Sequence, residues 1–220
     1  MTPKNFVNAL SSLHIENTFN PYSDTCPVFD NANASKIRKN SLLKLVEAAS
    51  KADIDSIWIG RDLGYRGGRR TGLALTDDVN IDRHAHRWGI EIPRVTNGAP
   101  VSERTAAVIW SALEKIEDNI FLWNVFPLHP FIAGNVFTNR THNSTERKIG
   151  EAILCELIST IKPRKIIAIG NDASVSASKL TSKIEINKFR HPSYGGQTIF
   201  LEQVSKAYEI NFHPLQSSLF

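Results

Sequence analysis

Three polar side chains that could do chemistry stand at or just beyond the ends of short apolar stretches: Asp62, Asn124 and His191. Asp62 has the type and place of a catalytic carboxylate, and it could equally close an Asx-turn. The amide of Asn124 could read the donor–acceptor edge of a ligand, or it could make a structural hydrogen bond. His191 precedes a proline and Ser193, so that a rigid bend presents an imidazole and a hydroxyl together.

The segment 61–78 is a basic, glycine-rich connection that is too polar to belong to a core. Its four closely spaced arginines are Arg61, Arg66, Arg69 and Arg70. A glycine-rich loop between a strand and a helix can place N–H groups and side chains over a ligand. On composition alone, a solvated loop and a phosphate-contacting loop remain equally open. Thr76, followed by two aspartates, predicts the start of a helix.

The apolar stretches alternate with amphipathic ones along the chain. The expected strands are 55–60, 119–125, 165–170 and 184–189. Helices are expected to begin at or near residues 34, 77, 102, 144, 171 and 197. This alternation predicts an α/β protein with three layers, α/β/α, around a central four-stranded parallel sheet. Ligands bind beyond the carboxyl ends of such strands, so Asp62, Asn124 and His191 are expected to converge there.

The bulk properties indicate one globular domain over residues 1–220, with residues 1–35 as an N-terminal arm packed on it. No apolar run approaches membrane-spanning length, and we expect a cytoplasmic monomer without a membrane partner. The net charge of +4 mildly favours a polyanionic partner. The chain has two cysteines, and His84 and His86 do not share a helix face. We therefore expect no metal and no other cofactor.

Four short motifs resemble, in order and in position, those of the uracil-DNA glycosylase superfamily. They are GRDLG at 60–64, TGLALTD at 71–77, WNV at 123–125 and HPS at 191–193. The stretch KIIAIGN is similar to the penultimate core strand of that family, and the resemblance covers roughly residues 20–210. It implies a hydrolase of base excision repair, which cleaves the N-glycosidic bond of uracil or another deaminated base flipped out of DNA.

The resemblance also implies roles for individual residues. Asp62 matches the residue that orients the attacking water, and His191 matches the histidine that stabilises negative charge on the departing base. The substrate-binding positions that it implies are Gly60, Gly64, Leu75, Asn124 and Ser193, with Asn124 reading the pyrimidine edge and Ser193 contacting a phosphate. The expected DNA-binding positions are Arg66, Arg69, Arg70, Tyr194 and Gly195.

The sequence also departs from the family pattern. Leu75 stands where a stacking phenylalanine is usual, and Leu63 replaces a proline. Gly64 takes the place of a tyrosine that excludes the methyl group of thymine. Tyr194 is the candidate to fill the vacated stack, because the usual leucine wedge is missing.

Two other functions therefore remain open. The first is a nucleic-acid-binding protein of the same fold without catalysis, which the leucine at position 75 favours. The second is an N-glycosidase that acts on free modified nucleosides. The arginine cluster argues against the second function, because a free nucleoside has no long polyanion to neutralise.

Overall fold

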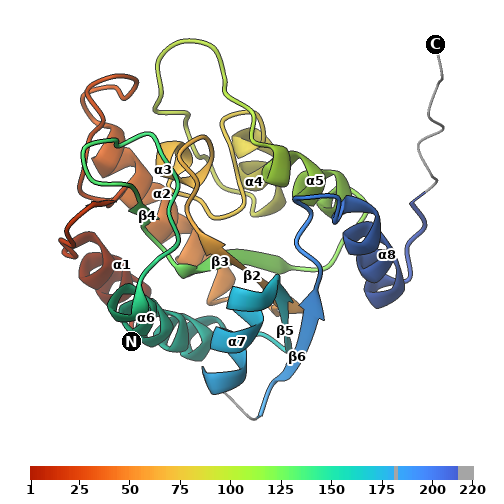
Figure 1. Ribbon diagram of the computed structural model, residues 1–220. Coiled ribbons are helices and arrows are strands. Elements are labelled where there is room, and N and C mark those ends of the chain that lie inside the picture. Colours follow the sequence, from red (N-terminus) through yellow and green to blue (C-terminus); the bar gives the residue numbers. More distant parts are fainter. Residues whose placement is uncertain (181–182, 213–220) are drawn as a thin grey trace, which may run out of the picture.

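The computed structural model describes residues 1–180 and 183–212. Its centre is a four-stranded parallel sheet with the strand order β3-β2-β5-β6 (Figure 1). The strands are β2 (Ser56–Asp62), β3 (Ile120–Phe126), β5 (Lys165–Ile169) and β6 (Glu185–Phe189). All four expected strands are present, and the predicted α/β fold with a central four-stranded parallel sheet is confirmed.

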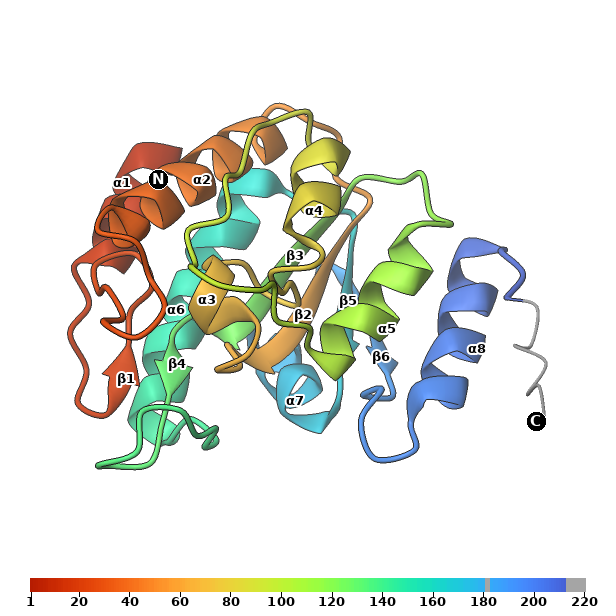
Figure 2. The ribbon, with the colours of Figure 1, turned by 90° about the horizontal axis from the view of Figure 1, so that it is seen from above.

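Helices cover both faces of the sheet (Figures 1 and 2). One face packs against α1 (Pro3–Ser11), α2 (Ala34–Ala49), α4 (Ile81–Arg87), α6 (Ser144–Ile161) and α7 (Asn171–Leu180). The other face packs against α5 (Arg104–Leu113) and α8 (Gln197–Tyr208). The remaining elements are the short helix α3 (Gly68–Thr71) and an antiparallel pair of two-residue strands, β1 (Thr18–Phe19) and β4 (His129–Pro130).

The middle strand β2 shows why the strands read as continuous apolar runs. Ile57 and Ile59 belong to one hydrophobic cluster, and Trp58 belongs to the cluster on the opposite face. Successive side chains of a strand point to opposite faces, so a strand covered on both sides needs apolar residues at every position. The indole N–H of Trp58 donates to the hydroxyl of Tyr208 across 2.9 Å, which ties α8 to the sheet.

A capping box fixes the start of α6. The side chain of Asn143 accepts hydrogen bonds from the N–H groups of Thr145 and Glu146, and the Glu146 carboxylate accepts from the N–H of Asn143. Reciprocal capping of this kind satisfies N–H groups that have no partner within the helix. It therefore also limits the position of His142, the residue that precedes the cap residue Asn143.

The helix expected to begin at residue 77 begins at Ile81 instead. One oxygen of Asp77 accepts the backbone N–H of Asn80, and the other accepts the N–H of Glu103. Asp78 pairs with Arg70 across 2.7 Å. These side-chain bonds compete with helical hydrogen bonding and hold the segment as a loop.

Within the described ranges, no helix is long and apolar enough to cross a membrane.

Candidate active site

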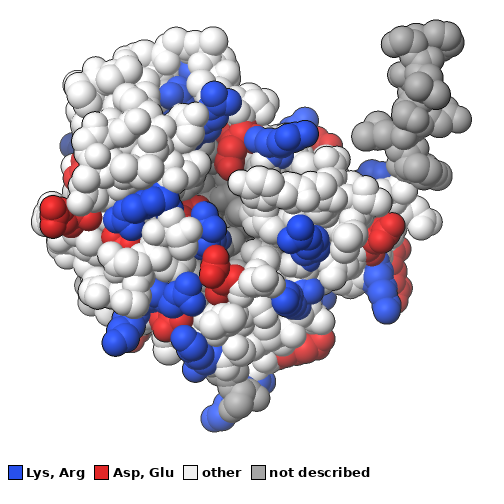
Figure 3. All heavy atoms as spheres, viewed as in Figure 1, with Lys and Arg blue, Asp and Glu red and all other residues white. Residues whose placement is uncertain are grey.

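A cavity of about 510 Å³ opens beyond the carboxyl ends of the central strands. Figure 3 shows the hollow in the middle of this face, with lysine and arginine side chains around it. Of the residues predicted for the site, seven line the cavity: Asp62, Gly64, Leu75, Asn124, His191, Ser193 and Tyr194. The parallel topology thus brings together side chains that are far apart in the sequence.

The pairing of β2 with β3 places Asn124 opposite Gly60. A Cβ atom on Gly60 would lie 2.4 Å from Oδ1 of Asn124 and 2.9 Å from a methyl carbon of Leu75. Only glycine leaves room for the Asn124 amide at this point. Asn124 is 1% exposed, and its Oδ1 has no hydrogen-bond partner among the described residues. An unpaired buried acceptor costs about 1–3 kcal/mol, which a ligand with an N–H group would recover.

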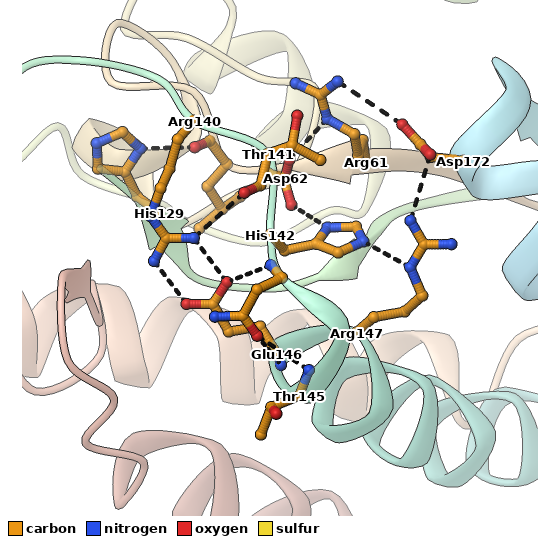
Figure 4. Close-up of polar contacts among 12 residues, drawn as sticks. Arg61, Asp62, His129, Arg140, Thr141, His142, Thr145, Glu146, Arg147 and Asp172 are labelled. Atoms are coloured by element: carbon orange, nitrogen blue, oxygen red, sulfur yellow. Dashed lines mark hydrogen bonds and ion pairs between the residues drawn. The ribbon is translucent and has the colours of Figure 1, made fainter. Parts of the chain in front are cut away.

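Asp62 is held from two sides instead of closing an Asx-turn. The Nε–H of Arg61 donates to Oδ2 of Asp62 across 2.7 Å, and Nδ1 of His142 forms a short hydrogen bond with Oδ1 (Figure 4). The Nε–H of Arg147, on α6, in turn donates to Nε2 of His142 across 3.2 Å. Both Asp62 and His142 have almost no exposed side-chain area. The carboxylate therefore has one fixed orientation at the end of β2.

His142 was not predicted as a site residue. It comes from the long irregular segment between β3 and α6, and the length of that segment was the one available signal, since such loops inside compact domains are usually functional. The sequence alone could not connect it with Asp62.

His191 is poised to donate a hydrogen bond. The backbone N–H of Ser193 donates to its Nδ1 across 3.2 Å, so a neutral imidazole carries its proton on Nε2. Burial lowers the pKa of His191, and the positive charges of Arg61 and Arg190 lower it further. The imidazole is therefore neutral near pH 7.

Two residues at the cavity have strained backbones. Leu75 has a φ of 53° and Tyr194 a φ of 51°, in the left-handed region that costs a residue with a Cβ atom about 1–2 kcal/mol. The indole N–H of Trp110 donates to the carbonyl oxygen of Leu75 across 3.1 Å and holds it there. Tyr194 is 99% exposed and is followed by Gly195, with a φ of 75°. Strain of this kind is typical of functional sites.

Glu103 lines the cavity and was not predicted as a site residue. It stands at the N-cap position of α5, but its carboxylate lies against the glycine-rich loop. A Cβ atom added to Gly64 would lie 3.4 Å from one carboxylate oxygen of Glu103, and a Cβ atom added to Gly67 would lie 2.4 Å from the other. Burial, with a smaller effect of the Asp77 charge, raises the pKa of Glu103 to about 7. The carboxyl group is therefore partly protonated at neutral pH.

The expectation that Arg69 and Arg70 contact DNA is corrected. They are 3% and 7% exposed, because the short helix α3 turns both side chains inward. The guanidinium of Arg69 lies 4.0 Å from the ring centroid of Phe19, and Arg70 pairs with Asp78. Buried groups with these partners cannot reach a phosphate.

Other cations are exposed near the cavity. The exposed arginines in or beside its lining segments are Arg61, Arg66, Arg104 and Arg190. Gly60 and Gly195 lie next to lining residues. In the part of the chain that the structure describes, no group of three or more His, Cys, Asp or Glu side chains is placed to hold a metal ion.

The parallel four-stranded sheet flanked by helices is consistent with the uracil-DNA glycosylase fold. The crystal structure of wild-type SMUG2 from Pedobacter heparinus is similar, with a TM-score of 0.61 and 13% sequence identity over 95% of this chain and 97% of that chain. At this identity the likeness shows the fold. No protein-family model and no curated protein matches the sequence.

Proposed function

We propose that this protein is a DNA glycosylase that hydrolyses the N-glycosidic bond of uracil or another deaminated base flipped out of DNA. The observation that carries the proposal is the unpaired, buried Oδ1 of Asn124, a residue that lines the same cavity as Asp62 and His191. A glycosylase-like fold supports the same reaction class. The proposed enzyme acts in the cytoplasm as a monomer, without a metal or other cofactor.

Asn124 reads the edge of the base in this proposal. Its Oδ1 accepts the ring N–H of uracil, and its amide N–H donates to a neighbouring carbonyl oxygen. Cytosine has no ring N–H at this edge and would leave Oδ1 unpaired. Because an unpaired buried polar group is costly, this contact discriminates strongly between the two bases.

In this proposal, Asp62 acts on the attacking water, and His191 acts on the departing base. The oxygen of a water molecule bonds to C1′ of the deoxyribose, and Asp62 takes one proton of that water. The C1′–N bond breaks, and its electron pair leaves with the base, which becomes negatively charged. Nε2–H of His191 donates to the oxygen on which this charge develops, which stabilises the transition state.

The exposed arginines around the cavity would neutralise phosphates, and Tyr194 would fill the position that the flipped nucleotide leaves in the stack. Tyr194 is the one phenylalanine, tyrosine or tryptophan among the described residues that line the cavity. Base stacking inside the pocket then depends on the apolar contact of Leu75.

The deciding experiment is a base-release assay. Oligonucleotides with uracil, hypoxanthine, xanthine or a 5-substituted uracil, single- and double-stranded, are incubated with the protein, and abasic sites are cleaved and counted. We expect release of at least one deaminated nucleobase. Asp62→Asn keeps the shape of the side chain but removes the carboxylate that accepts the proton, so release should be about 10²–10⁴-fold slower. Equal release by wild type and Asp62→Asn would contradict the proposal.

The absence of a stacking aromatic at Leu75 favours one second candidate, a nucleic-acid-binding protein without catalysis. The two functions differ in one measurement: this candidate requires DNA binding with no base release from any substrate. An N-glycosidase of free modified nucleosides would instead release bases from nucleosides and not from oligonucleotides.

A further inference from the structure

Five side chains in and beside the cavity lining form a closed ring of hydrogen bonds and ion pairs (Figure 4). They come from the end of β2, the segment before α6, α6 itself and α7, and they are Arg61, Asp62, His142, Arg147 and Asp172. Arg147 lies 3.3 Å from one oxygen of Asp172, and Arg61 lies 3.7 Å from the other. The ring contains two cations and two anions, so its charges balance.

The ring determines which nitrogen of His142 carries the proton. The Nε–H of Arg147 can only donate, so Nε2 of His142 must accept. The proton of the neutral imidazole is then on Nδ1, where it donates to Oδ1 of Asp62. A doubly protonated imidazole would place an N–H group against the N–H of Arg147.

The ring also limits the motion of Asp62. Each of its oxygens accepts one hydrogen bond, from His142 and from Arg61. An ionised carboxylate has about four acceptor sites, so each oxygen keeps one site for a water molecule. Rotation of the carboxylate would break both bonds at once. The orientation of the free acceptor sites is therefore set by the ring, and His142 is its most buried member.

We propose that His142 is a positioning residue for the reaction, which holds the carboxylate of Asp62 in the orientation that accepts a proton from the attacking water. This inference rests on the proposed function. His142 does not touch the substrate, and its effect passes through Asp62. Arg147 and Asp172 contribute to the same positioning, because they fix the tautomer and the ring plane of His142.

The first test reads the tautomer directly and needs no substrate. Nitrogen-15 NMR of histidine-labelled protein distinguishes a protonated nitrogen from an unprotonated one. We expect Nδ1 of His142 to be protonated and Nε2 to be unprotonated at pH 7.5, with Arg147→Met removing this preference. The resonance is assigned by its loss in His142→Asn. A wild-type His142 protonated on Nε2 would overturn the ring.

The second test separates positioning from stability by three variants. His142→Leu removes the donor to Asp62, whereas His142→Asn keeps an N–H group near the place of Nδ1. Ser56→Ala is the control for stability, since it removes the hydrogen bond between Ser56 and Tyr208 at the amino end of β2 without touching Asp62 or His142. Release of uracil, or of the best base found, is measured at a temperature at which all three are folded.

We expect His142→Leu to lower kcat by about 10²-fold with KM nearly unchanged, because the misplaced carboxylate affects the transition state more than substrate binding. His142→Asn should recover part of the loss. Ser56→Ala should lower Tm and leave kcat near that of the wild type. Equal kcat for His142→Leu and Ser56→Ala, or no recovery in His142→Asn, would overturn the positioning role.

The outcomes also separate this inference from the proposed function. If the wild type releases no base, the glycosylase proposal fails, and the positioning role fails with it. The NMR result still decides whether the ring and its tautomer exist. If the wild type is active and the His142 variants match it, the proposed function stands and the inference alone is wrong.

Discussion

The backbone N–H of Ser193 donates to Nδ1 of His191 across 3.2 Å, and this contact leaves Nε2 as the proton-bearing nitrogen of the neutral ring. The bond is local, because the bend at Pro192 brings the N–H group back to the imidazole. A histidine that must donate to a departing base needs this tautomer. The turn after β6 thus prepares His191 before any substrate arrives.

His191→Ala should lower kcat for base release by about 10²–10³-fold, the loss typical of one donor to a developing anion. Burial and two neighbouring cations lower the pKa of His191, so the neutral form persists when the pH falls through 6.5. The contribution of His191 should therefore be lost only at a pH below the ordinary range of histidine. The measurement is kcat against pH for both proteins. A step near pH 6.5 that is present in the wild type and absent in His191→Ala would contradict this.

Asn124→Asp should weaken uracil release selectively. The change replaces the amide donor by a second acceptor and leaves a carbonyl oxygen of the base unpaired, at a cost of about 1–3 kcal/mol. We expect kcat/KM for uracil to fall by about 10–100-fold. Thermal unfolding of the free protein serves as the control, because a general loss of structure would lower Tm as well. Unchanged uracil release would place Asn124 outside the base-binding pocket.

Glu103→Gln should stabilise the protein at alkaline pH. The pKa of Glu103 is raised in the folded state, so its contribution to stability is present below its unfolded value and is lost as the pH rises through about 7. Glutamine keeps the shape and carries no charge. We expect the difference in the free energy of unfolding to be near zero at pH 4 and up to about 3 kcal/mol at pH 8.5. Urea titrations at both pH values measure it, and a constant difference would contradict burial of the carboxyl group.

DNA binding should depend strongly on salt and on the exposed arginines of the cavity face. Each neutralised phosphate of a duplex contributes about −0.9 to the slope of log affinity against log salt. Arg66→Glu should weaken binding to all DNA sequences alike and reduce this slope. Arg164→Glu is the matched control, because Arg164 is exposed next to the amino end of β5, at the opposite edge of the sheet. Fluorescence anisotropy at several salt concentrations tests both, and equal effects would contradict a cavity-face interface.

The sequence by itself determined the sheet, because strands buried on both faces need nearly continuous apolar residues, as in residues 57–59 of β2 and 120–123 of β3. It also placed Asp62, Asn124 and His191 at one edge, since the carboxyl ends of parallel strands meet there. A polar residue inside an apolar run, such as Asn124, is visible without a structure.

Only the tertiary structure decided which side chains meet across segments. The side chains of Arg69 and Arg70 point inward because both residues lie in α3, a single turn of helix. The glycine-rich sequence around α3 has no hydrophobic periodicity from which this turn could be predicted. The contact between His142 and Asp62 depends on the capping of α6 and on the packing of α6 against β3. Local patterns set the period and the ends of an element, whereas a hydrogen bond between distant residues depends on how the packed elements come together in space.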